Sequence, residues 1–66
     1  MEYKQTETEF KPTWVYIYDA ENHNTGMNIW ADKVKRKEFN DGHIMYVINY
    51  HSFIIAFVHS PYVVKY

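Results

Sequence analysis

The sequence contains no cysteine, two glycines, two prolines and a single arginine. Without cysteine there is neither a disulfide framework nor a thiol nucleophile. Two isolated glycines, Gly26 and Gly42, do not make a glycine-rich loop of the kind that holds phosphate groups. The lack of cysteine also fits a reducing compartment, so we predict a cytoplasmic protein.

The chain is short, with 66 residues, which excludes a multidomain enzyme and predicts one small domain over residues 1–66. Hydrophobic residues make up 47% of it and aromatic residues 20%, enough apolar material to exclude wholesale disorder. Domains of this size are usually stabilised by disulfides, metals or association. Because disulfides are excluded here, we expect association, in the form of a homodimer.

The formal net charge is −1, too low for a dedicated nucleic-acid binder, although residues 33–37 form a basic cluster. Residues 43–64 carry no Asp, Glu, Lys or Arg, as a membrane span would. However, Asn49, His51 and Ser52 would then lie near the middle of the bilayer. We therefore expect no membrane partner, and the polar start of the chain does not resemble a secretory signal.

Hydrophobic patterning favours an all-β fold, a small antiparallel meander or barrel of about five strands. Trp14, Tyr16 and Tyr18 alternate with Val15 and Ile17, which predicts a strand. Residues 1–12 are expected to form an edge strand or arm that is closed by Pro12. Residues 44–58 are apolar on both parities, which predicts two strands with a turn at 49–52, followed by a last strand at 62–66.

The stretch between the two predicted loops is ambiguous. Residues 20–26 have loop composition, with Gly26 free to adopt positive φ, and Asp41-Gly42 is typical of a tight hairpin. Between them, Met27, Ile29 and Ala31 alternate as in a strand. The alternative is an α+β fold with a helix at about 28–39 packed on a four-stranded sheet, because Ala31 and the basic residues favour helix.

No catalytic or metal-binding set emerges, so we predict a protein that is not an enzyme and has no cofactor. The two serines, Ser52 and Ser60, each follow a histidine, but neighbours in a strand point in opposite directions. His43 and His59 would lie opposite one another if the chain reverses at His51. They are weak metal candidates, since structural zinc takes four ligands, and our expectation is that no metal is bound.

Two binding functions are compatible with these residues. An aromatic surface of Trp14, Tyr16, Tyr18 and Trp30 would suit a protein-binding module, because such side chains anchor interfaces. Abundant Ile, Lys, Asn and Tyr are the residue bias of AT-rich coding sequence, which suggests a phage or mobile-element inhibitor or regulator of a host protein. The alternative is a single-stranded nucleic-acid-binding sheet that uses Lys33, Lys35, Arg36 and Lys37.

Overall fold

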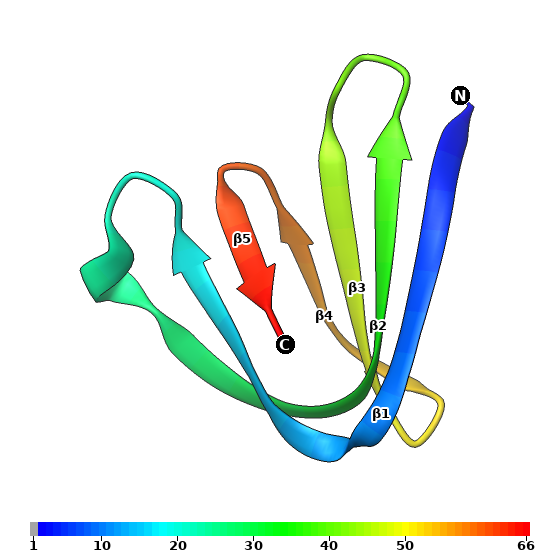
Figure 1. Cartoon of the computed structure of the whole chain (residues 1–66), viewed down its shortest axis with the longest axis vertical. Coiled ribbons are helices and arrows are strands. Elements are labelled where there is room, and N and C mark those ends of the chain that lie inside the picture. Colours follow the sequence, from blue (N-terminus) through cyan, green and yellow to red (C-terminus); the bar gives the residue numbers. More distant parts are fainter. Residues whose placement is uncertain (1) are drawn as a thin grey trace.

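The computed structural model describes residues 2–66, which form one five-stranded antiparallel sheet (Figure 1). Its strands are β1 (Tyr3–Asp19), β2 (Met27–Phe39), β3 (Ile44–Tyr50), β4 (Phe53–His59) and β5 (Tyr62–Lys65), in the order β4-β3-β2-β1-β5, with a 3-10 helix, η1 (His23–Thr25), between β1 and β2. The all-β prediction of about five strands is confirmed. No helix within residues 2–66 is long and apolar enough to cross a membrane.

Strands β1 and β2 form a long hairpin that bends sharply in the middle (Figure 1). Glu9 pairs with Lys33 and Thr13 pairs with Ala31, so three residues of β1 lie opposite Asp32 alone. Such an irregularity bends the strand and leaves residues without ladder partners. Pro12, which has no N–H to donate, occupies this unpaired position. The prediction that Pro12 closes the first strand is therefore wrong, since β1 continues through it to Asp19.

The alternative with a helix at about 28–39 is also wrong. This segment is strand β2, which pairs with β1 along its whole length and with β3 from Lys33 to Glu38. A helix here would have presented a narrow apolar stripe of Ile29, Trp30 and Val34. In the sheet, β2 satisfies its backbone on both sides over Lys33–Glu38, and tertiary pairing overrides the local helix propensity.

Three reversals connect the first four strands, and each uses different chemistry. At Asn40–Gly42, Gly42 adopts φ 88°, and the Phe39 amide donates to the His43 carbonyl at 2.8 Å. At the β3–β4 turn, His51 and Ser52 both have positive φ, as a two-residue type I′ hairpin requires. The predicted turn at 49–52 is thus shorter than expected, because Asn49 and Tyr50 still belong to β3.

Gly26, in the reversal between β1 and β2, has an extended φ of −77°, so it does not use the positive φ that glycine allows. Its lack of a side chain matters for another reason. A Cβ atom at this position would overlap the ring of Tyr16. Glycine therefore permits a close approach between the backbone of the loop and an aromatic side chain of β1.

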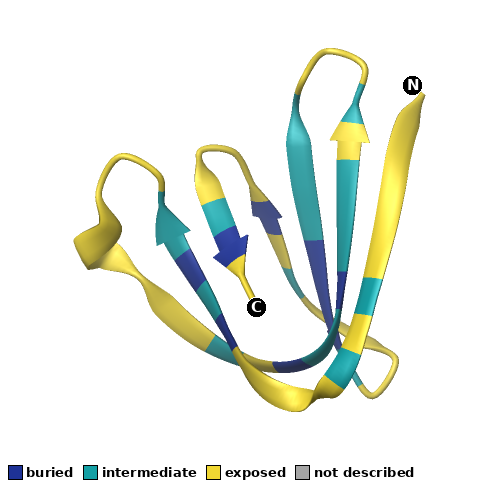
Figure 2. Ribbon diagram, viewed as in Figure 1, coloured by how far each residue is buried: buried dark blue, intermediate teal, exposed yellow. Residues whose placement is uncertain are grey.

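The core lies on the inner face of the bent sheet and is built from small β-branched and alanine side chains (Figure 2). Its buried members are Val15, Ile17, Ala31, Val34, Ile48, Val58 and Val64. In β2 the inward-pointing positions change from odd-numbered (Ala31) to even-numbered (Val34). The irregularity at the bend is the cause, because it reverses which side chains of the strand point to the core. Phe10, Ile29, Tyr46 and Ala56 pack around this cluster.

Besides the outer side of the short terminal strand β5 and residues 27–32 of β2, the described part of the sheet leaves two longer stretches of edge open. Strand β5 pairs with β1 only from Tyr16 to Asp19, so the first half of β1, which includes most of the predicted 1–12 edge segment, has β2 as its neighbour. Met1, the first residue of that segment, lies outside the described residues. Strand β4 forms the opposite edge of the sheet. Both stretches appear largely exposed in Figure 2.

Candidate protein-binding surface

Trp14 and Trp30 face each other across the β1–β2 hairpin. They are register partners, and their rings meet edge to face with centroids 5.1 Å apart and an interplanar angle of 72°. Val15 and Ile17 point into the core, so alternation turns Trp14 to the outer face of the sheet. Trp14 is 60% exposed and Trp30 42% exposed. Two large aromatic side chains in mutual contact on the outer face therefore remain exposed to water.

Tyr16 and Tyr18 continue the same face along β1. Their rings stack at 5.4 Å, and the ring of His23 meets Tyr18 edge-on at 4.9 Å. The Tyr16 hydroxyl donates a hydrogen bond to the His23 carbonyl at 3.2 Å. The structure thus brings together all four residues of the predicted aromatic surface, which we define as Trp14, Tyr16, Tyr18 and Trp30.

The loop beside the aromatic surface is held by its own hydrogen bonds. The Asn22 side chain caps η1 by accepting from the Asn24 amide at 3.2 Å, and the Thr25 hydroxyl donates to the Asn22 carbonyl at 2.9 Å. Asp19 accepts from the Glu21 amide at 2.8 Å. These contacts position His23, which lines a shallow cleft of about 220 Å³ together with Tyr16, Tyr18 and Lys65.

The four cations of the predicted nucleic-acid site do not form one patch. Lys33, Lys35 and Lys37 alternate along β2 and share a face. Arg36 lies on the opposite face, where it is the register partner of Tyr46. The pKa of Arg36 is raised, chiefly by the hydrogen bond with Tyr46; desolvation lowers it, and Glu38 at 3.3 Å raises it further. Only three lysines can therefore act together.

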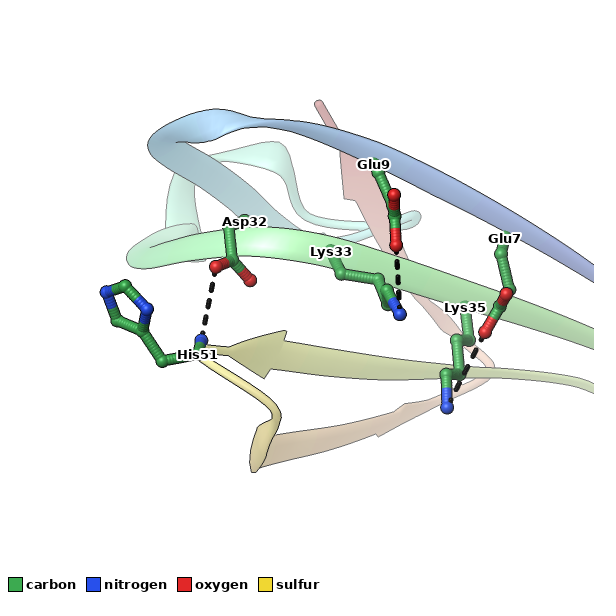
Figure 3. A network of polar contacts seen from close by, with 6 residues as sticks. All are labelled: Glu7, Glu9, Asp32, Lys33, Lys35 and His51. Atoms are coloured by element: carbon green, nitrogen blue, oxygen red, sulfur yellow. Dashed lines mark hydrogen bonds and ion pairs between the residues drawn. The ribbon is translucent and has the colours of Figure 1, made fainter.

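Two of these lysines are already paired with carboxylates (Figure 3). Lys33 Nζ lies 3.1 Å from Glu9, and Lys35 Nζ lies 3.6 Å from Glu7. The hydrogen bond and charge of Glu9 raise the pKa of Lys33, so this lysine keeps its charge at neutral pH. Lys37 Nζ lies 5.1 Å from the centre of the Tyr3 ring. The paired glutamates cancel much of the positive charge that a phosphate backbone would meet.

A polar cavity of about 490 Å³ lies beside these ion pairs, lined by residues that include Asp32, Lys33, Asn49 and His51. Asp32 accepts a hydrogen bond from the His51 amide at 3.1 Å, which joins the β3–β4 turn to β2, whereas the His51 ring points away from the lysines (Figure 3). Asn49 is 5% exposed, and its Oδ1 atom has no hydrogen-bond partner among the described residues. Sequence reasoning missed this cavity because Asn49 was assigned to the turn.

The two histidines singled out as weak metal candidates do meet. His43 Nε2 lies 3.0 Å from His59 Nδ1, and the ring centroids are 5.3 Å apart. Within residues 2–66, no group of three or more His, Cys, Asp or Glu side chains is placed to share a metal ion. The contact is a hydrogen bond between two imidazole rings.

A second exposed apolar region lies on β4. Strand β4 exposes Phe53 at 73%, Ile54 at 55%, Ile55 at 43% and Phe57 at 59%. The edge position of this strand in the sheet could not be read from its composition.

Comparisons with protein-family models, curated proteins and solved structures find no match. The function of the chain is therefore argued from its own surfaces.

Proposed function

We propose that this chain is a non-enzymatic protein-binding module that recognises its partner through the aromatic surface. The observation that carries the proposal is the exposure of the Trp14–Trp30 pair on the outer face of a hydrogen-bonded hairpin. Tryptophan and tyrosine dominate the energetics of protein interfaces because they bury 150–250 Å² each with few torsions to restrict. Register pairing holds both rings in place before binding, which lowers the entropy cost of association.

The neighbouring loop supplies polar groups around this apolar centre. His23 and Lys65 line the cleft next to Tyr16 and Tyr18. An apolar centre with a polar rim is the common anatomy of protein interfaces. The arrangement suits a partner with two features. One is an apolar projection that fits over the tryptophans, and the other is a hydrogen-bond acceptor that reaches Lys65.

We further propose that the partner is a cytoplasmic host protein and that the chain is a phage-encoded or mobile-element inhibitor or regulator. This part rests on the residue bias of the sequence, which is rich in Ile, Lys, Asn and Tyr. It also rests on the absence of a recognisable catalytic set in the sequence. Covering a functional surface of another protein requires no chemistry of its own.

Single-stranded nucleic-acid binding is the second candidate, favoured by the shared face of Lys33, Lys35 and Lys37. Sheets that bind single strands place aromatic rings beside such cations for stacking. Here the salt bridges to Glu9 and Glu7 must first break, and the aromatic surface lies beyond the bend of β1 and β2. Protein binding through the aromatic surface requires no salt bridge to break.

The experiment uses tagged chain as bait in lysate of the host cell, followed by titration with the purified partner in calorimetry. Trp14→Ala should weaken binding by at least about 30-fold, the effect of a hot-spot residue. The triple variant Lys33→Glu/Lys35→Glu/Lys37→Glu is the matched control and should bind within about threefold of the wild type, since rim charges contribute little. The proposal is contradicted if the lysine variant loses binding and Trp14→Ala does not.

A parallel titration with a fluorescent single-stranded RNA separates the second candidate. A Kd that rises steeply with salt, together with loss of binding in the lysine variant, would favour nucleic-acid recognition.

A further inference from the structure

Strand β4 has an open backbone edge. It pairs on one side with β3, from Met45–His59 to Tyr50–Phe53. On its other side no strand is paired with it within residues 2–66, because the following strand, β5, pairs with β1. An open edge presents a row of backbone N–H and C=O groups that can pair with another strand.

The side chains of this edge are unusually apolar. Phe53, Ile54, Ile55 and Phe57 are all more than 40% exposed, and the strand from Phe53 to Val58 contains no charged residue. An irregularity in the β3–β4 pairing leaves Ile55 without a register partner. An apolar cavity of about 530 Å³, lined by residues that include Met27, Phe57 and Tyr62, continues this surface towards β2 and β5.

The long open edge on the first half of β1 is protected differently. Along the first half of β1, Lys4, Glu7, Glu9 and Lys11 place charges at short intervals. Charged side chains are the usual means by which proteins prevent strand edges from pairing with other chains. The molecule therefore guards the long β1 edge with charge and leaves the β4 edge unguarded, which indicates that the β4 edge is normally covered.

A second copy of this chain fits the β4 edge best. Antiparallel pairing of β4 with β4 about Ile55 places Phe53 of each copy beside Phe57 of the other and Ile54 beside Ala56, and no charge is buried. The four exposed side chains present roughly 450 Å² of apolar area per copy if a large side chain has about 200 Å². That is more than half of the ~800 Å² that each partner buries in a standard interface, and the backbone edge supplies part of the remainder.

We propose that two copies associate through their β4 strands, antiparallel and about a twofold axis at Ile55, to form one continuous sheet. A twofold axis makes the contact self-complementary and closed, so assembly stops at the dimer. The aromatic surface of each copy, on β1 and β2, stays free for its own partner.

Sedimentation equilibrium tests this proposal at chain concentrations between about 1 and 100 µM. In this range an interface of standard size is expected to hold a dimer together. The wild type should be a dimer over most of the range. Ile55→Lys places a charge at the axis and should raise the dimer Kd by at least about 100-fold. Trp14→Lys is the matched control, since it also replaces an exposed apolar side chain by lysine, and it should remain a dimer. Circular dichroism confirms that both variants fold.

Because the chain has no cysteine, a single introduced cysteine reports the axis directly. Oxidised Ile55→Cys should give a disulfide-linked dimer in high yield on a non-reducing gel, whereas oxidised Thr6→Cys on the guarded edge should stay monomeric on the same gel. A monomeric wild type at 100 µM overturns the proposal. So does a dimer that survives Ile55→Lys but is lost in Trp14→Lys, and so does assembly into open-ended oligomers.

Discussion

His43 and His59 contact each other across the open ends of β3 and β4, with Nε2 of the first 3.0 Å from Nδ1 of the second. The contact requires that one nitrogen donates and the other accepts, so at least one ring is neutral. His59 is the register partner of Met45, two residues from His43, which places both rings on the same face.

The contact predicts an energetic coupling between the two histidines. His43→Ala and His59→Ala should each destabilise the fold slightly, and the double variant should lose less than the sum, by about 0.5–1 kcal/mol. Urea unfolding of the four proteins measures this coupling. Additive single effects would show that the rings do not interact in solution.

The β3–β4 turn predicts a stabilising substitution. Ser52 adopts φ 69°, a conformation that costs a non-glycine residue about 1 kcal/mol or more and costs glycine nothing. Ser52→Gly should therefore raise the free energy of unfolding by about 1 kcal/mol and the Tm by about 4–8 °C. Gly42→Ala, at φ 88°, is the opposite control and should lower the stability by a similar amount. A lower Tm for Ser52→Gly would contradict the assigned turn.

Asp32 predicts a specific link between β2 and this turn. Its carboxylate accepts from the His51 amide at 3.1 Å, so Asp32→Ala should cost about 1 kcal/mol, the net contribution of a typical hydrogen bond. Hydrogen exchange of the His51 amide, followed by NMR, should accelerate in this variant. Unchanged exchange at His51 would mean that another acceptor holds the turn.

The close approach of Gly26 to Tyr16 predicts strong non-additivity. Gly26→Ala should destabilise the protein by about 1–3 kcal/mol, because the new methyl group overlaps the tyrosine ring although the backbone angle suits any residue. In a Tyr16→Ala background the same substitution should cost less than about 0.5 kcal/mol. Equal costs in both backgrounds would place the origin of the effect in the backbone.

Period-two patterning was sufficient to predict the strands around Trp14–Tyr18 and the apolar pair that became β3 and β4, because alternation and β-branched content report directly on a half-buried sheet. It also placed the aromatic residues on one face. The Asp41-Gly42 pair also located a turn correctly, because Gly42 adopts positive φ there.

Features that depend on pairing between distant strands were not readable. The bend at Pro12 arises from a register mismatch with β2, and β2 itself is a strand because β1 and β3 flank it. The ion pairs of Glu9 and Glu7 with lysines of β2 follow from the same register. The sequence alone therefore did not show that part of the basic cluster is paired with carboxylates. Gly26 was assigned to the right loop, but glycine is needed there for its close approach to Tyr16 and not for a positive φ.

The central claim, that the aromatic surface binds a protein, can be tested directly because Trp14 and Trp30 are the two tryptophans of the chain. Both can be replaced by 5-fluorotryptophan and observed by ¹⁹F NMR without interference from the partner. On addition of the purified partner, we predict that both resonances shift and lose their sensitivity to exchange of H₂O for D₂O, since water leaves the rings. Saturating complex formation with both resonances unchanged and still solvent-sensitive would contradict the account.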